Sequence, residues 1–143
     1  MLIRSTIISV MLMVLSIGIA RGQSEVSTGA STLAEEYYKA GDFDKAANEY
    51  GKLLKTDVTW FRLSRYVVSL QKSNKVDDAL KFLKRQQRSD ETNRAYYELL
   101  TGQLAAQRGD TTMSKAHYSA ALQSSKSSVA KLDRIAMAFS ETG

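Results

Sequence analysis

The sequence of 143 residues contains no cysteine, no proline and a single histidine. The absence of cysteine excludes disulfides, thiolate metal sites and a cysteine nucleophile, and it suits either redox environment. Because proline is absent and glycines are few, the chain favours long helices over a turn-rich β architecture. A hydrophobic content of 43% is enough for one domain with a buried core.

The first 22 residues differ in character from the rest of the chain. Arg4 precedes an uncharged apolar run, and Ala20 and Gly22 stand at the spacing typical of a signal-peptidase site. We therefore expect a secretory signal peptide at 1–22, cleaved near Gly22, and a flexible leader at 23–31. An uncleaved membrane anchor is the alternative, but about 15 apolar residues are fewer than the roughly 20 that span a bilayer. We expect an exported protein, periplasmic or secreted, that meets a membrane only if the signal is kept.

The positive charge of the chain is mild. Loss of Arg4 and Arg21 with the signal would reduce the formal net charge from +5 to +3. The basic residues concentrate in "KFLKRQQR", residues 81–88. This segment indicates either an anionic partner or a solvated helix face whose C-terminal cations suit the helix dipole, and we favour the second. No nucleic acid is expected as a partner, because no basic strand motif interleaved with aromatics is present.

A glycine-aspartate pair interrupts the helical pattern in "YYKAGDFDKAANEYGKLL". Apolar residues recur at helical spacing on both sides of it. Gly41 can take the left-handed conformation that ends one helix, and Asp42 can accept from the free amides that begin the next. The stretch predicts two antiparallel helices.

The same interruption returns at Asn74 and at Gly109, after 33 and then 35 residues. Asparagine is physically sensible at the second turn, because it tolerates the left-handed conformation well. Residues of similar size recur at fixed distances from each turn. Seven positions before it stands a small or medium-sized residue (Ala34, Val67 and Gly102), and five positions after it a small one (Ala46, Ala79 and Ser114). Nine positions after it stands a bulky one (Tyr50, Leu83 and Tyr118). A unit of about 34 residues is reused.

These features resemble the tetratricopeptide repeat (TPR) family over residues 28–143. The resemblance implies an all-α fold, a right-handed α-solenoid of antiparallel helix pairs. It divides the domain into repeats of about 28–60, 61–94 and 95–128 and a final helix at 129–143. The second repeat lacks both glycines, and the proline that usually closes each repeat is missing throughout.

The last predicted helix ends where a fourth turn would stand. We expect it to be either a capping helix or the start of further repeats in a longer array. Met137 and Phe139 favour the longer array, because they would leave more apolar surface than a cap needs. Such a patch would contact missing repeats or another subunit, so self-association through the final helix is a second expectation.

Proteins of this family usually hold a peptide or helix in a concave groove lined by the first helix of each repeat. The resemblance therefore implies an exported interaction scaffold that binds a peptide or protein partner. The groove candidates are Glu35, Tyr38, Lys39, Arg65, Val68, Lys72, Tyr96, Gln103 and Gln107, with Ser64, Gln71 and Leu99 beside them. Arg65 and Lys72 could both meet a carboxylate of the partner, or both could simply be solvated. The alternative function is a structural N-terminal segment of a longer TPR array, or an oligomer-forming module in envelope assembly.

Catalysis is not expected. His117 has no second histidine or cysteine with which to build a familiar metal site. Neither a nucleophile elbow nor a glycine-rich phosphate loop is present. The adjacent carboxylates at 35–36 and at 77–78 would diverge on a helix. We predict no catalytic residue, metal or cofactor, and we expect the tyrosines, among them Tyr37, Tyr50, Tyr66 and Tyr118, to form repeat core.

Overall fold

The computed structural model describes residues 29–125 and 128–142, with the backbone alone at 129 and 138–142. Every regular element in these ranges is an α-helix, which confirms the all-α prediction. A first helix is described over 29–39. The others are α2 (Phe43–Leu53), α3 (Trp60–Lys72), α4 (Val76–Ser89), α5 (Arg94–Gln107), α6 (Thr111–Ser124) and α7 (Val129–Thr142).

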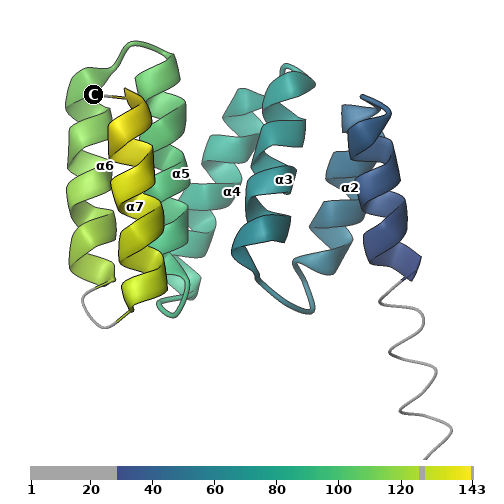
Figure 1. Cartoon of the computed structure of the whole chain (residues 1–143). Helices are drawn as coiled ribbons and strands as arrows, with labels where there is room; N and C mark the ends of the chain where they lie inside the picture. The colour runs from purple at the N-terminus through teal and green to yellow at the C-terminus, as the bar shows by residue number, and fades with distance from the viewer. Residues whose placement is uncertain (1–28, 126–127, 143) are drawn as a thin grey trace, which may run out of the picture.

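The helices stand side by side in chain order, from the first helix at one edge to α6 and α7 at the other (Figure 1). Each of the helices from α2 to α6 packs on the one that follows it, and α5 also contacts α3 and α7. This central position explains the burial of α5, which is buried from Tyr97 to Gly102 without interruption. Neighbours on two sides leave only a narrow strip of α5 at the surface.

The three predicted turns share one backbone geometry. Gly41, Asn74 and Gly109 all have positive φ angles, of 77°, 58° and 78°. At each turn the following amide donates to a carbonyl five residues back, as in Lys75 N to Leu70 O at 2.8 Å. The turn residue itself donates to the carbonyl three residues back, as in Asn74 N to Gln71 O at 3.1 Å. This pair of bonds is the Schellman motif, so the sequence prediction of three left-handed helix ends is confirmed.

The predicted capping role of Asp42 is wrong. Asp42 is the residue before α2, but its side chain accepts no hydrogen bond from the amides of that helix. The carboxylate is instead bonded to Lys45 Nζ at 2.6 Å, because a lysine three residues ahead competes for it. At the third turn the aspartate does cap the helix that follows, since Asp110 Oδ1 accepts from Met113 N at 2.9 Å.

The positions repeated in the sequence form the core. The residues that follow the turns by five and nine positions are at most 4% exposed, and Ala34, Val67 and Gly102 are buried as well. Position 102 requires glycine for a steric reason, because a Cβ there would lie 2.5 Å from the ring of Tyr118. Tyr50 and Tyr118 thus belong to the core as predicted, while Tyr37 and Tyr66 are partly buried against it.

Candidate binding face

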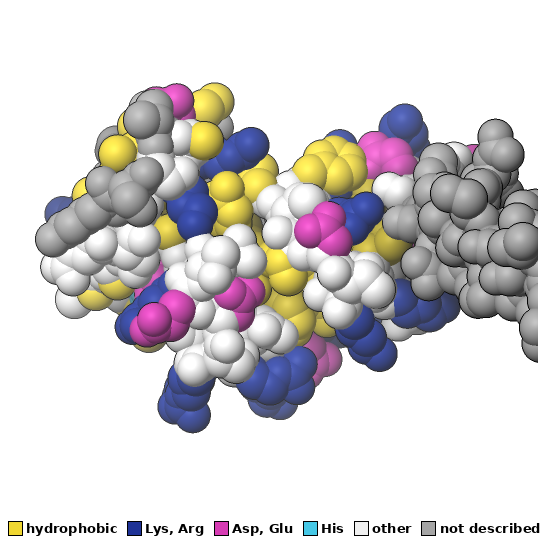
Figure 2. All heavy atoms as spheres, turned by 90° about the horizontal axis from the view of Figure 1, so that it is seen from below, with side chains coloured by type: hydrophobic (Ala, Val, Ile, Leu, Met, Phe, Trp, Pro, Cys, Tyr) yellow, Lys and Arg dark blue, Asp and Glu magenta, His cyan; other side chains and the backbone are white. Residues whose placement is uncertain are grey.

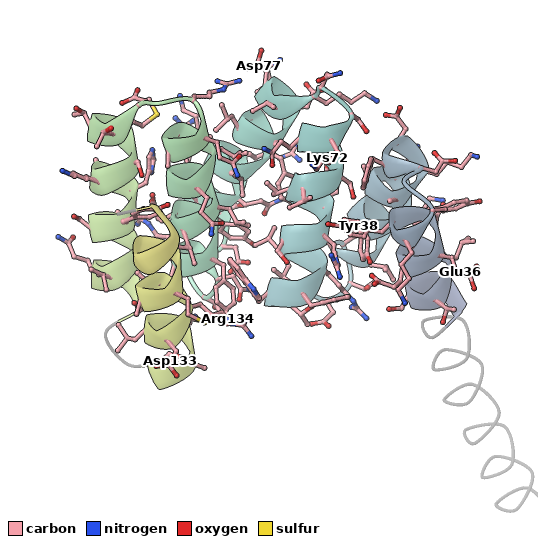
Figure 3. The ribbon with its side chains drawn as sticks, turned by 45° about the horizontal axis from the view of Figure 1, so that its top comes forward. Glu36, Tyr38, Lys72, Asp77, Asp133 and Arg134 are labelled. Carbon is pink, nitrogen blue, oxygen red and sulfur yellow. The ribbon has the colours of Figure 1, made fainter. Side chains whose placement is uncertain are left out.

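All nine predicted groove residues have partly or fully exposed side chains. They come from the first helix, α3 and α5, and we refer to their surface as the candidate binding face. Its members are Glu35, Tyr38, Lys39, Arg65, Val68, Lys72, Tyr96, Gln103 and Gln107. Figure 3 shows Tyr38 between the first helix and α3, Lys72 near the end of α3, and Glu36 pointing away from both.

Tyr38 and Arg65 join the first helix to α3. The guanidinium carbon of Arg65 lies 4.0 Å from the ring centroid of Tyr38, and its Nη2 lies 3.5 Å from Glu35 Oε1. The hydroxyl of Tyr50 donates to the other oxygen of Glu35 at 2.5 Å. Burial is the main reason that the pKa of Tyr50 is raised, and the neighbouring carboxylate adds to it. The Glu35 carboxylate therefore takes part in a contact within the fold.

Arg65 and Lys72 are not equivalent, although the sequence suggested them as a pair. Arg65 already faces an internal carboxylate, and its buried Nε has no hydrogen-bond partner among the described residues. Lys72 is exposed, and it forms no ion pair with any residue that the structure describes. Of the two cations, Lys72 is thus the one available to a carboxylate from outside.

A hydrogen bond connects α3 with α5 on this face. Gln71 Nε2 donates to Gln107 Oε1 at 2.5 Å, so two residues singled out from the sequence meet in space. Gln103 lies one helical turn before Gln107 on α5 and is partly exposed. Amide side chains of this kind can both donate to and accept from a backbone laid across them.

An aromatic and cationic cluster extends the face to α7. The ring centroids of Trp60 and Tyr96 are 5.3 Å apart. Arg134 lies over Trp60 and Lys131 over Tyr96, each at 5.3 Å from the ring centroid. Lys131 Nζ also donates to the carbonyl of Thr92 at 2.5 Å. Figure 3 shows Arg134 on the side of α7 that faces α3.

Sequence reasoning identified only Tyr96 in this cluster. Trp60 is the first residue of α3, and Lys131 and Arg134 lie on α7, whose sequence pattern is marked by its apolar residues. The contacts among these residues depend on the packing of helices that are far apart in the sequence, and no local sequence pattern predicts them. Figure 2 looks at the end where α3, α5 and α7 begin, and it shows hydrophobic side chains in the seams between helices with charged ones beside them.

A shallow hollow lies at the other edge of the face. Its volume is about 400 Å³, and its lining includes Glu35, Lys39 and Phe61. Phe61 is 49% exposed and lies over the Arg65 guanidinium at 5.2 Å. The hollow offers an aromatic surface between the first helix and α3.

Leu99 does not belong to the face. Its side chain is fully buried, in a cluster with Tyr118, Ala121 and Ile135. Leu99 therefore points toward α6 and α7. Helical periodicity alone could not show this, because α5 is covered on more than one side.

His117 has a structural contact. Its Nδ1 lies 2.7 Å from Glu98 Oε2, and Arg94 Nε lies 3.7 Å from the other oxygen of the same carboxylate. Glu98 is 5% exposed, so these neighbours give polar partners to a buried carboxyl group between α5 and α6. Within the described residues, no group of three histidine, aspartate or glutamate side chains is placed to hold a metal ion.

The predicted signal peptide and residues 23–28 of the predicted leader lie outside the described residues, whereas residues 29–31 of that leader begin the first helix. None of the helices described combines the length and the apolar character that crossing a membrane requires. The basic stretch of α4 is exposed at Lys81, Lys84, Arg85 and Arg88, which agrees with a solvated helix face. Comparison of the sequence with models of protein families and with curated proteins finds no match.

Proposed function

We propose that this protein is an exported scaffold that binds a peptide or protein partner on the candidate binding face. The observation that carries the proposal is that residues chosen from three separate helices form contacts with one another. Tyr38 stacks on Arg65, and Gln71 bonds to Gln107, so the face is continuous across the helices. A continuous strip that crosses three helices suits an extended or helical segment of a partner.

The arrangement of helices proposed is a right-handed α-solenoid of TPR type. Three Schellman turns at nearly equal spacing support it, together with the buried small and bulky residues at repeated positions. In such a solenoid the candidate binding face would be the concave surface.

The face suits a segment that carries carboxylates beside apolar side chains. Lys39, Lys72, Lys131 and Arg134 present cations around it, while Glu35 is engaged with Arg65 and Tyr50. The rings of Trp60 and Tyr96 supply large, partly exposed apolar surface. Rings, amides and cations together would recognise a mixed polar and apolar segment without any cofactor or catalytic group.

Export rests on the sequence of the first 22 residues. Mass spectrometry of the mature protein tests it, and the expected N-terminal residue is Gln23, or Arg21 if cleavage follows Ala20. Recovery of intact Met1 from the membrane fraction would replace export with anchoring.

Self-association through α7 is the second candidate function. Met137 is 64% exposed on this helix, which favours a contact with another subunit or with further repeats. Phe139, the other residue on which this expectation rests, has a side chain outside the described part. Sedimentation of the wild-type protein and of Met137→Lys tests self-association. If α7 joins two copies of the chain, the variant should sediment with a lower mass than the wild type, and otherwise the two masses should be equal.

Capture of partners from an envelope extract tests the main proposal. The test variant is Lys72→Glu with Gln103→Glu, which reverses or adds charge on the face without touching the Arg65 contact. The matched control is Lys115→Glu with Gln123→Glu, both exposed on α6. We expect the test variant to lose the captured partner and the control to keep it. Equal capture by both variants, at equal melting temperatures, would contradict the proposal.

A further inference from the structure

A cleft of about 610 Å³ lies between α2 and α4, on the other side of α3 from the candidate binding face. Figure 1 shows α4 behind α3 in the view that has α7 in front. The floor of the cleft is apolar and comes from Ala47, Leu54, Tyr66, Leu70 and Phe82. None of the nine groove residues lines it, so it is a separate site.

Short side chains on α2 keep the cleft open. Ala47, Asn48 and Gly51 all line it, and none of them is long enough to reach α4. A Cβ at Gly51 would lie 3.3 Å from the Tyr66 ring, so the aromatic floor comes close to the backbone there. Tyr66 and Phe82 pack edge to face with ring centroids 4.8 Å apart.

The rim of the cleft carries four cations and two carboxylates. Two of the cations are used within the fold, because Lys75 pairs with Asp44 at 2.7 Å and Lys52 with Glu49 at 2.7 Å. The Lys75 contact also lowers the pKa of Asp44.

The other two cations, Lys55 and Arg85, form no ion pair within the described residues. Arg85 lies 5.9 Å from the centroid of Phe82, beside the aromatic floor. Two positive charges without an ion pair thus flank an open hollow whose floor is apolar and whose rim is polar.

We propose that this cleft binds a short acidic peptide segment of a protein partner, with one large apolar side chain on Tyr66 and Phe82 and carboxylates on Lys55 and Arg85. Charge complementarity selects the acidic segment, since a basic one would face unpaired cations. The apolar floor requires a side chain of the size of phenylalanine or leucine, because an anion alone would leave the rings uncovered. The site goes beyond the proposed function, because it would allow a second contact on the opposite side of α3.

A fluorescently labelled pentapeptide, with phenylalanine at its centre and glutamate at the four other positions, is a suitable probe. Fluorescence anisotropy measures its binding to the full mature chain. We expect saturable binding that weakens as salt increases, since the contacts are partly electrostatic. An analogue with alanine at the centre and one with lysine in place of glutamate should each bind about tenfold more weakly or not at all, the former losing apolar burial and the latter its attraction.

Two variants place the binding in the cleft. Lys55→Glu with Arg85→Glu removes the attraction, and Asn48→Trp fills the hollow while the cations remain. Each variant should weaken binding of the probe by at least about tenfold. The matched charge control, Lys84→Glu with Lys115→Glu, lies outside the cleft and should bind as wild type does.

The outcomes separate this site from the candidate binding face. Because the candidate binding face could also take an acidic probe, the cleft variants are measured in the Lys72→Glu and Gln103→Glu background, which should still bind the probe through the cleft. Wild-type binding that survives both cleft variants would overturn the cleft proposal, as would no binding at millimolar peptide. A change in sedimentation of the free protein caused by Asn48→Trp would also overturn it, in favour of a second copy of the chain.

Discussion

The guanidinium carbon of Arg134 on α7 lies 5.3 Å from the ring centroid of Trp60, the first residue of α3. Trp60 also packs on Tyr96 of α5, so one side chain connects three helices. It contacts two of the core clusters, which makes it a link between the middle of the molecule and α7. The extent of the candidate binding face therefore depends on this ring.

Removing the ring should destabilise the protein more than removing the cation. Because Trp60 is only partly buried, Trp60→Ala should lower the free energy of unfolding by about 2–3 kcal/mol, below the value of a fully buried tryptophan. Arg134→Ala should cost about 0.5–1 kcal/mol, as expected for an exposed cation over a ring. Urea denaturation measures both. Trp60 is the single tryptophan, so Arg134→Ala should also shift its emission to longer wavelength, and unchanged emission would argue against the contact.

Two glycines in helices should respond differently to alanine. At Gly102 the added Cβ would lie 2.5 Å from two atoms of the buried Tyr118 ring, so Gly102→Ala should destabilise by about 1–3 kcal/mol through overpacking. At Gly51 the nearest atom is 3.3 Å away on the partly buried Tyr66, and alanine gains about 0.5–1 kcal/mol of helix propensity. Gly51→Ala should therefore be close to neutral. Thermal unfolding of the two variants measures this difference. Equal losses of stability in Gly102→Ala and Gly51→Ala would contradict the packing described for Gly102.

The turn at Asn74 should improve with glycine. Asn74 has φ of 58°, a conformation that costs most residues about 1–2 kcal/mol. Asn74→Gly should therefore raise the free energy of unfolding slightly, and Asn74→Ala should lower it by about 1 kcal/mol. Chemical denaturation compares the two. If alanine were as stable as glycine, the turn would not be left-handed in solution.

Part of this fold could be read from the sequence because its turns have a strict backbone requirement. Glycine or asparagine at 41, 74 and 109 marks the left-handed positions, and the small residues near them mark close helix contacts. The capping prediction at Asp42 is wrong because Lys45, three residues ahead, binds the carboxylate, and a capping pattern does not include such a competitor. Leu99 lies in the core and not on the candidate binding face, because a period of 3.6 residues cannot show which of several neighbouring helices covers each side of α5. The Trp60 cluster depends on three helices, and no single segment contains that information.

The Tyr97–Asp90 hydrogen bond should make stability fall in acid. Burial acts to raise the pKa of Asp90, but hydrogen bonds from Tyr97 and Asn93 outweigh it and lower the pKa below 3.8. A carboxyl with a lowered pKa contributes stability above its unfolded pKa, and this contribution is lost as pH falls through the folded one.

Tyr97→Phe tests this dependence. It removes a bond of 2.7 Å, worth about 1–2 kcal/mol at neutral pH because the acceptor is charged. The gap in free energy of unfolding between wild type and Tyr97→Phe should narrow as pH falls from 6 to 2. Tyr66→Phe is the control, because the Tyr66 hydroxyl donates no hydrogen bond within the described residues. A gap that stays constant with pH would show that the Asp90 charge is not involved.

Site-specific photo-crosslinking tests the central claim most directly. A photoreactive phenylalanine analogue would replace Val68 on the candidate binding face, Met137 on α7 or Leu122 on α6, all of them partly or fully exposed. Each protein would be irradiated in cells of the source organism, and the crosslinked product identified by mass. Binding of a partner on the candidate binding face predicts a product with another protein from Val68 and none from Leu122. A product from Met137 alone, with a second copy of the chain as its partner, would contradict the account and favour self-association.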